Sequence, residues 1–289
     1  MNPFTDPVWL AEARAWIESQ VEVSGEIEQP HVRAWATALR VPTADGVVWF
    51  KAARDEFAFE AALLELLTPL APDLVTEVIA SRPGAGWLLM ADGGERAREH
   101  PIDWAPLQRR YAELQIAAIE HAGAMRALGA FDLRTERLPS FVEKLFPCLQ
   151  PETAERLRDG LPRINELFAQ LASSPLPATI EHGDLHDANV FVRDGHARIL
   201  DWGDANVAHP LLSLTVEMDE TARPSYLEPW TAFAPLAQLE AEAGVVLELR
   251  YLLRAINWLK VVQYDRERTI AGIDDRVNWF FDGLPGDGS

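Results

Sequence analysis

The sequence predicts an α+β fold in two lobes: a small lobe built on an antiparallel sheet with one main helix, and a larger lobe that is mostly helical. Three features lead to this. Roughly the first ninety residues hold short runs rich in β-branched and apolar side chains. The remainder is dominated by long stretches with apolar residues three and four positions apart. Between them, Asp92-Gly93-Gly94 marks a linker, so we expect lobes at residues 1–92 and 93–289.

The small lobe is predicted to begin with a helix, followed by three strands, the main helix and two further strands. The turn at Ala44-Asp45-Gly46 separates the second and third strands, and a turn at residues 83–86 joins the last two. In chain order, the elements are helix 6–19, strands 21–28, 31–43 and 46–53, helix 54–70, and strands 76–81 and 86–91.

The large lobe is predicted to combine long helices with short strands around one polar cluster. The helices are 103–128, 151–173 and 246–264, and the strands are 178–181, 190–193 and 197–200. The last two strands form a hairpin with a turn at Asp194-Gly195. Asp184 and Asp201 can therefore face the same cleft, with Asn189 between them.

Composition restricts the class of protein and of partner. The formal net charge is -19, so nucleic acid is not an expected partner, whereas a cationic small molecule would be steered favourably. No apolar run reaches the roughly 18 residues that a membrane span needs. The N-terminal residues lack the basic and apolar stretches of a secretory signal, and Cys148 is the single cysteine. We therefore expect a cytoplasmic protein without a membrane partner.

The polar cluster has the composition of a phosphoryl-transfer site. Carboxylate and amide oxygens are the hard ligands that suit Mg²⁺, which keeps several waters and completes its shell with substrate phosphates. Asn189 and Asp201 supply such oxygens. Asp184, separated from Asn189 by four residues, could accept the proton of a hydroxyl group.

A cation for nucleotide phosphates is predicted in the small lobe. Lys51 ends the apolar strand 46–53, and Glu60 follows nine residues later in a strongly apolar helix. An unpaired charge among so many apolar residues is costly, so we expect Lys51 and Glu60 to pair. The pair would aim the ammonium at the α- and β-phosphates.

With these residues in place, the chain resembles the aminoglycoside phosphotransferase family, a branch of the protein-kinase-like superfamily that also includes choline kinases. His182-Gly183-Asp184, four further residues, Asn189 and then Asp201 resemble the family's Brenner-type loop and metal-binding aspartate. Lys51 and Glu60 match the strand lysine and the helix glutamate of the superfamily. The resemblance covers most of the chain and implies a bilobal protein-kinase-like fold.

The resemblance implies a Mg²⁺-dependent phosphotransferase that moves the γ-phosphate of ATP or GTP to a hydroxyl of a small molecule. Asp184 would be the base, and Asn189 and Asp201 would hold Mg²⁺ on the β- and γ-phosphates. Residues 86–94 look like the last strand of the small lobe running into the hinge, which puts Met90 and Ala91 at the adenine. We expect His182 to support the loop rather than to catalyse.

Two departures from the family pattern concern the loops. The phosphate-covering loop is expected at residues 25–31, which contain one glycine; backbone amides of residues 29–32, with His31 or Arg33, are the candidate phosphate contacts. Ser213 stands where many members carry an aspartate, so its anchoring role passes to the hydroxyl or is absent.

The acceptor has no marker in the sequence. Residues 215–289 hold 13 Asp plus Glu and 7 Arg plus Lys, a net of -6, which is no more acidic than the chain as a whole, so a cationic acceptor is compatible but not indicated. Polar residues that could line the acceptor site, or equally be solvated loop residues, are His186, Asp187, Asp204, Asp219 and Glu220. Three tryptophans, for which packing in the helical core is favoured over an acceptor site, are Trp230, Trp258 and Trp279.

Two other functions compete with this prediction. A catalytically silent nucleotide-binding module is suggested by the glycine-poor loop and by Ser213. A metallohydrolase is suggested by His182, Asp184 and His186, but it lacks the further histidine ligands such sites need. The metallohydrolase also leaves Lys51 and Glu60 unexplained.

Overall fold

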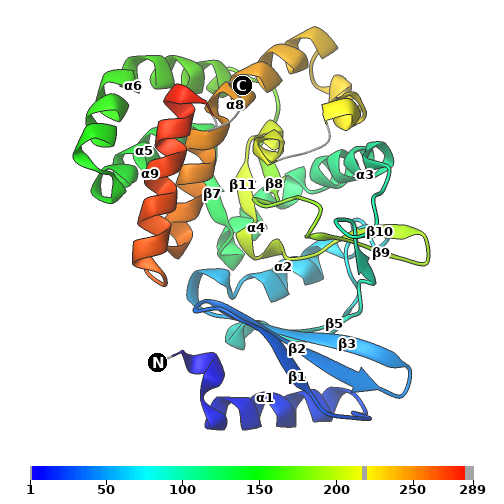
Figure 1. The fold of residues 1–289 in the computed structure, drawn as a ribbon. Coiled ribbons are helices and arrows are strands. Elements are labelled where there is room, and N and C mark those ends of the chain that lie inside the picture. Colours follow the sequence, from blue (N-terminus) through cyan, green and yellow to red (C-terminus); the bar gives the residue numbers. More distant parts are fainter. Residues whose placement is uncertain (1, 217–219, 284–289) are drawn as a thin grey trace. The chain divides into compact units, whose positions relative to one another are not determined.

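The computed structural model of the protein describes residues 2–216 and 220–283. The chain divides into two compact units, one of residues 1–102, 127–130 and 187–204, the other of residues 103–126, 131–186 and 205–289 (Figure 1). The first unit therefore includes the polar hairpin as well as the N-terminal sheet; the lobe boundary at residue 92 stays a prediction. Within the described residues, no helix combines the length and apolarity needed to cross a membrane.

An antiparallel sheet of five strands forms the centre of the first unit, in the order β1-β2-β3-β5-β4. The main helix, α2 (Glu60–Leu67), lies between the third and fourth strands in the sequence, as predicted. The strands are β1 (Glu28–Val32), β2 (Ala36–Thr43), β3 (Gly46–Ala53), β4 (Val78–Arg82) and β5 (Trp87–Ala91).

The beginning of this sheet differs from the prediction. The strand predicted at 21–28 is wrong: apart from a single bridge between Val23 and Thr43, pairing starts only at Glu28. The strand predicted at 31–43 is interrupted, because the Arg33 amide donates to the Ala36 carbonyl (2.8 Å) and closes a turn at residues 33–35. The turn between the first two strands is therefore Arg33-Ala34-Trp35, not residues 25–31, and contains no glycine.

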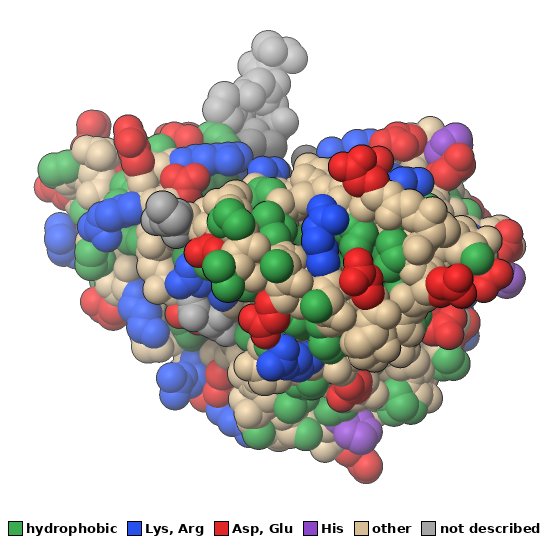
Figure 2. All heavy atoms as spheres, turned by 90° about the horizontal axis from the view of Figure 1, so that it is seen from below, with side chains coloured by type: hydrophobic (Ala, Val, Ile, Leu, Met, Phe, Trp, Pro, Cys, Tyr) green, Lys and Arg blue, Asp and Glu red, His purple; other side chains and the backbone are tan. Residues whose placement is uncertain are grey.

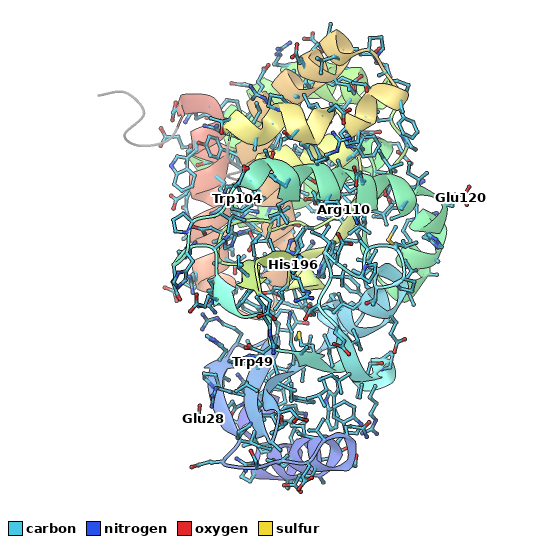
Figure 3. All side chains as sticks on the ribbon, turned by 90° about the vertical axis from the view of Figure 1, so that its right-hand side faces the viewer. Glu28, Trp49, Trp104, Arg110, Glu120 and His196 are labelled. Atoms are coloured by element: carbon cyan, nitrogen blue, oxygen red, sulfur yellow. The ribbon has the colours of Figure 1, made fainter. Side chains whose placement is uncertain are left out.

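Strand alternation decides which way Lys51 points. The N-terminal helix α1 (Pro7–Gln20), predicted at 6–19, covers one face of the sheet and packs its aromatic rings against Phe50 and Trp87. Because successive side chains of a strand point to opposite faces, Lys51 lies on the other face. Trp49 (Figure 3) shares that face and donates a hydrogen bond to Asp92 (2.9 Å).

The predicted hairpin is present in the first unit. It is formed by β9 (Val190–Arg193) and β10 (His196–Ile199), and β6 (Glu95–Arg96) pairs with β9. Asp194 and Gly195 both have positive φ (53° and 78°), which is the backbone that a two-residue hairpin turn requires. The Ile199 amide donates to the Leu74 carbonyl (2.8 Å), so the hairpin is tied to the segment that follows α2.

The second unit is mostly helical, with a three-stranded sheet in the order β7-β11-β8. Its strands are β7 (Phe131–Leu133), β8 (Thr179–Glu181) and β11 (Asn206–Ala208). Its longer helices are α3 (Trp104–Ala117), whose Trp104 and Arg110 are labelled in Figure 3, α5 (Leu138–Leu145), α6 (Pro151–Ala172), α8 (Leu236–Trp258) and α9 (Arg266–Asp282); α4 (Ala122–Leu128) and α7 (Arg223–Leu227) are shorter.

Two helix predictions need correction, and the helices α5, α7 and α9 were not predicted. The helix predicted at 103–128 is two helices, α3 and α4, separated by a 3-10 turn at Ile119–His121. The helix predicted at 246–264 begins at Leu236, because the segment rich in Ala, Leu and Glu before residue 246 is also helical, and it ends at Trp258. Helix α9 was not predicted, since only Thr269, Ile273 and Val277 are buried, an apolar stripe too narrow to stand out among charges.

Charged side chains are mixed on the surface. On the face shown in Figure 2, acidic and basic side chains alternate with hydrophobic ones instead of gathering in one patch. The net charge of -19 is thus not concentrated on that face.

Candidate active site

Lys51 and Glu60 form the predicted ion pair inside the first unit. The Lys51 Nζ atom lies 2.8 Å from Glu60 Oε1 and 2.6 Å from Oε2. The side chains are 14% and 4% exposed, so the pair is largely removed from water. Glu60 Oε1 also accepts a hydrogen bond from the Trp202 amide (2.9 Å), which ties α2 to the segment after β10.

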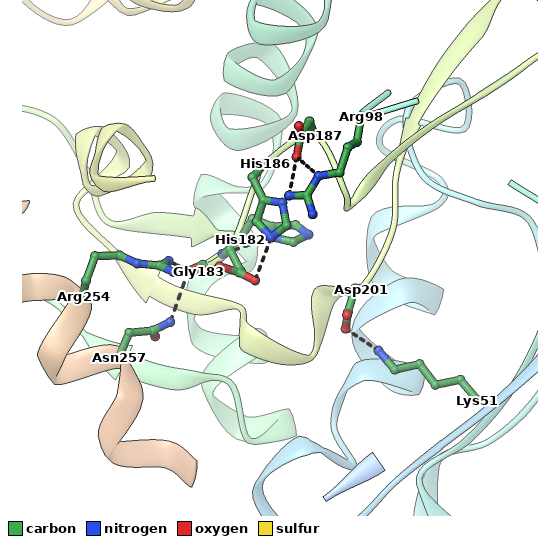
Figure 4. Close-up of polar contacts among 10 residues, drawn as sticks. Lys51, Arg98, His182, Gly183, His186, Asp187, Asp201, Arg254 and Asn257 are labelled. Atoms are coloured by element: carbon green, nitrogen blue, oxygen red, sulfur yellow. Dashed lines mark hydrogen bonds and ion pairs between the residues drawn. The ribbon is translucent and has the colours of Figure 1, made fainter. Parts of the chain in front are cut away.

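Asp201 adds a second carboxylate to the same ammonium. Its Oδ1 atom lies 2.5 Å from Lys51 Nζ (Figure 4), while 55% of its side chain is exposed. Burial on its own lowers the pKa of Lys51, but Asp201 and Glu60 outweigh it and hold that pKa above its ordinary value. Lys51 is therefore a permanent cation with one buried and one solvated carboxylate.

Asn189 and Asp201 lie at the same end of the hairpin. The antiparallel pairing of Ile199 with Val190 continues for one step, since the Leu200 amide donates to the Asn189 carbonyl (2.9 Å). Asp201 is the next residue and has positive φ (63°), an uncommon conformation for a non-glycine residue that is often kept at functional positions. The turn at Asp194-Gly195 lies at the opposite end of the same hairpin.

The donor set of this hairpin fits Mg²⁺. One amide oxygen and one exposed carboxylate leave most of the coordination shell to water and to phosphate, which is how Mg²⁺ is commonly held. In the part of the chain that the structure describes, no group of three or more His, Cys, Asp or Glu side chains is placed to hold a metal ion. The metallohydrolase alternative, which needs such a group, gains no support.

In the second unit, both carboxylate oxygens of Asp184 have partners. Arg254 Nη2 donates to Oδ1 (2.9 Å), and His186 Nε2 lies 3.2 Å from Oδ2. Arg254 Nη1 also donates to the Gly183 carbonyl (2.8 Å), as does the Asn257 side chain (3.2 Å; Figure 4). Two residues of α8 therefore fix the backbone and the carboxylate of the Asp184 loop.

These partners decide the charge of Asp184. Burial by itself raises the pKa of the Asp184 carboxyl group. The hydrogen bond with His186 and the charge and hydrogen bond of Arg254 lower that pKa by more than burial raises it. The net result is a pKa below the ordinary value of an aspartate. Asp184 is thus held as a carboxylate, in the charge state that a base or a hydroxyl-orienting group needs.

Buried polar side chains of the second unit support this loop. The His182 amide donates to the Tyr111 hydroxyl (2.9 Å), and the His182 side chain is buried, with Nδ1 accepting from the Asp184 amide (3.3 Å). Ser213 Oγ lies 3.2 Å from the Tyr111 hydroxyl and accepts from Gln115 (3.1 Å). The Ser213 hydroxyl therefore reaches the loop through Tyr111, and the contacts of His182 agree with the supporting role expected of it.

The remaining candidates lie in varied surroundings. The Ala91 amide already donates to the Glu77 carbonyl (3.0 Å), and Met90 is buried in β5; their contact with adenine stays a prediction. Asp187 is bound by Arg98 (2.7 Å). Trp230 is fully buried, as expected of a core residue, whereas Trp258 and Trp279 are only partly buried. Asp219 and the side chain of Glu220 fall outside the described residues.

Sequence reasoning missed Arg254, Asn257 and Tyr111. A signal existed for Arg254, which is a single cation within the apolar run Leu252–Ile256. A charge in such a run needs a partner, by the same reasoning that paired Lys51 with Glu60. The other two carry no comparable signal, because polar residues of helices are ordinary until their neighbours are known.

Arg254→Gln is expected to lower the free energy of unfolding by about 1–3 kcal/mol at neutral pH, the range for a hydrogen bond to a charged group. A carboxyl group whose pKa is lowered by folding stabilises the protein above its unfolded pKa of about 3.9, and that contribution disappears as pH falls through the folded pKa. Without Arg254 the pKa of Asp184 rises, although His186 and Arg276 still lie near it.

Urea unfolding of both proteins between pH 3 and 7 measures this difference. The gap between wild type and Arg254→Gln should be largest at neutral pH and should narrow as pH falls through the folded pKa of Asp184 in the variant, because the unfolded chains of the two proteins titrate alike. A gap that is independent of pH would mean that Arg254 acts through packing alone.

Comparison with known proteins supports a kinase-like fold. The model of the phosphotransferase enzyme family (APH) matches residues 27–256. No curated relative matches the chain. Among solved structures, the chain is similar to the macrolide 2'-phosphotransferase MphH from Brachybacterium faecium (16% identity, 95% of this chain and 98% of that chain covered, TM-score 0.61). It is also similar to an ethanolamine kinase from Plasmodium vivax (11% identity, 97% of this chain and 90% of that chain covered, TM-score 0.63). A third similar structure is a choline/ethanolamine kinase family protein from Mesorhizobium loti (15% identity, 94% of this chain and 95% of that chain covered, TM-score 0.65).

Proposed function

Since the chain belongs to the phosphotransferase enzyme family (APH), we propose that it transfers the γ-phosphate of ATP or GTP to a hydroxyl group of a small molecule, with Mg²⁺ as cofactor. The observation that carries this proposal is the charge state of Asp184 in the second unit and of Lys51 in the first. Asp184 is held as a carboxylate by His186 and Arg254, and Lys51 is held as a cation by Asp201 and Glu60. These are the states that a base and a phosphate-binding group require.

Asp184 takes the role of the base. It orients the acceptor hydroxyl and receives its proton as the new oxygen–phosphorus bond forms and the bond to the nucleotide breaks. Because its pKa is low, the carboxylate is a weak base, and its larger contribution is to orient the hydroxyl through a charged hydrogen bond. Arg254 and Asn257 position it through the Gly183 carbonyl and the carboxylate itself.

Lys51, Asn189 and Asp201 hold the phosphates. When bound, Mg²⁺ neutralises the charge that develops on the β- and γ-phosphate oxygens. Asn189 and Asp201 would hold the ion with one oxygen each, and Lys51 would bind the α- and β-phosphates. Glu60, buried and doubly hydrogen-bonded, keeps the ammonium in place. Met90 and Ala91 are proposed to lie beside the adenine.

The alternative of a catalytically silent nucleotide-binding module has one observation in its favour. The turn between β1 and β2, Arg33-Ala34-Trp35, lacks glycine, so its backbone has less freedom to close around phosphate groups. If the protein is an active phosphotransferase, the side chains of Lys51, Asn189 and Asp201 hold the phosphates instead.

A screen of acceptors decides between the two. We expect nucleotide consumption that requires both Mg²⁺ and an added hydroxyl compound, measured with ATP and with GTP across sugars, amino alcohols, polyols, hydroxy acids, macrolides and aminoglycosides. The acceptor that gives turnover should appear as a phosphate ester by mass spectrometry. Nucleotide binding without turnover on any acceptor class would favour the silent module, and failure to bind either nucleotide would contradict both.

A further inference from the structure

A second arginine lies close to the Asp184 loop, on the last helix of the second unit. Helix α8 contributes Arg254 and Trp258, which are four residues apart, and α9 contributes Gly272 and Arg276, also four apart. Residues with this spacing share one face of a helix. The two faces meet, because the guanidinium carbon of Arg276 lies 3.7 Å from the ring centre of Trp258. We call these four residues the α8–α9 cluster.

The α8–α9 cluster is a defined site and not a loose surface arrangement. A Cβ atom at Gly272 would overlap the Trp258 ring, so glycine is required for the ring to lie where it does. The ring in turn supports the flat guanidinium of Arg276, and the ring centre of Trp279 lies 5.6 Å from the guanidinium carbon. The Arg276 side chain is thereby held in one orientation, at the edge of the protein interior.

The charge of Arg276 is incompletely matched by its neighbours. Burial lowers the pKa of Arg276 to about 10, and the neighbouring charge of Arg254 contributes to this shift, while Asp275 and Asp184 oppose it. Within the described ranges, no carboxylate lies at ion-pair distance from Arg276, and Nη1 is its one nitrogen with a hydrogen bond, to the Gly272 carbonyl (2.8 Å). Among the described residues, Arg276 therefore has no carboxylate in contact with it, and Asp275 and Asp184 act on its charge from further away.

A purely structural role explains the half-buried charge of Arg276 less well. An apolar side chain could pack against Trp258 without bringing a charge out of water, and replacing buried charges by apolar groups is often neutral or stabilising. A half-buried arginine with nitrogens left over for further bonds is instead the usual means of recognising a planar, bidentate anion such as a carboxylate or a phosphate group.

We propose that the acceptor carries an anionic group, a carboxylate or phosphate, that binds Arg276 beside Arg254 and so places the acceptor hydroxyl at Asp184. The proposal rests on the proposed function and names its substrate class. It replaces the cationic acceptor that the net charge of -19 had left open. That net charge is not an obstacle, because surface charges beyond about 8 Å are largely screened at physiological ionic strength, whereas the two guanidinium groups act at contact distance.

Matched acceptors that differ in one charged group test the proposal. We expect kcat/KM to be at least about 10-fold higher for the carboxylate member of each pair, such as gluconate against sorbitol or glycerate against glycerol, with choline as a cationic comparison. In Arg276→Gln this preference should disappear through a higher KM for the carboxylate, while activity on the neutral member is retained. Arg276→Lys, which keeps the charge but loses the planar group, should retain part of the preference.

A matched control and a binding assay make the result decisive. Arg268 lies exposed on the same helix, so Arg268→Gln removes one charge from α9 without touching the cluster, and should leave the preference intact. Arginine side-chain NMR of the ¹⁵N-labelled protein with gluconate or sorbitol reports binding without turnover. A change in the arginine side-chain signals on addition of gluconate but not of sorbitol, absent in Arg276→Gln, would support the site.

Two results would overturn this inference while leaving the proposed function intact. One is turnover in which kcat/KM for neutral or cationic acceptors equals kcat/KM for the anionic ones. The other is an Arg276→Gln protein whose activity falls equally on all acceptors and whose melting temperature also falls, which would indicate a structural arginine. If no acceptor at all is phosphorylated, the proposed function fails, and NMR binding of gluconate still decides whether the α8–α9 cluster is an anion site.

Discussion

Asp184→Asn is expected to reduce kcat for phosphoryl transfer by about 10²–10⁴-fold and to leave the Kd for the nucleotide unchanged. Asparagine has the same shape as aspartate, so the Arg254 hydrogen bond to the side-chain oxygen can persist. What disappears is the charge that orients the acceptor hydroxyl and receives its proton. The nucleotide Kd is preserved because Lys51, Asn189 and Asp201 are untouched.

The matched control for this experiment is Asp187→Asn. Asp187 is three residues further along the same loop, and its carboxylate is bound by Arg98 through two hydrogen bonds (2.7 and 2.9 Å). Removing that negative charge should change kcat by no more than a few-fold, since surface ion pairs contribute little. Steady-state kinetics on the acceptor found in the screen, together with nucleotide titration, measures both variants. Equal activity of Asp184→Asn and wild type would show that another group is the base.

Two features of the candidate site could be predicted from the sequence because they depend on short, local patterns. A lysine at the end of an apolar strand and a glutamate in an apolar helix were enough to predict the pairing of Lys51 with Glu60, and the structure brings these side chains to 2.6 Å. The dipeptide Asp194-Gly195 between two apolar runs predicted the hairpin, and both residues have the positive φ that its turn requires. In each case, the spacing along the chain nearly determines the spacing in the folded protein.

Contacts made over long sequence separations were not predictable in this way. Arg254 reaches Asp184 across 70 positions, and Tyr111 reaches His182 across 71. Helix α9 was missed for a related reason, since it is held to α8 by Trp258 and Arg276 rather than by a wide apolar face of its own. The α8–α9 cluster, on which the acceptor proposal depends, is therefore visible only in the folded chain.

Lys51→Met is expected to lower the free energy of unfolding by about 3–5 kcal/mol, in addition to lowering kcat/KM by at least about 100-fold. Methionine fills much of the same volume but leaves Glu60 buried without its cation. Burial raises the pKa of Glu60, and the negative charge of Asp201 adds to that rise, so the remaining carboxylate is poorly stabilised. Asp201 itself, half exposed, can be solvated by water. As a control, Lys144→Met removes an exposed lysine from α5 and should cost less than about 1 kcal/mol.

The double variant Lys51→Met/Glu60→Gln separates the two effects. Glutamine at position 60 is neutral and keeps a side-chain oxygen for the Trp202 amide, so most of the lost stability should return in urea unfolding. Activity should not return, because the cation for the nucleotide phosphates is still missing. Recovery of both would assign Lys51 a purely structural role. If neither stability nor activity returned, the loss of stability would come from the missing contacts of the Lys51 side chain and not from the unpaired charge of Glu60.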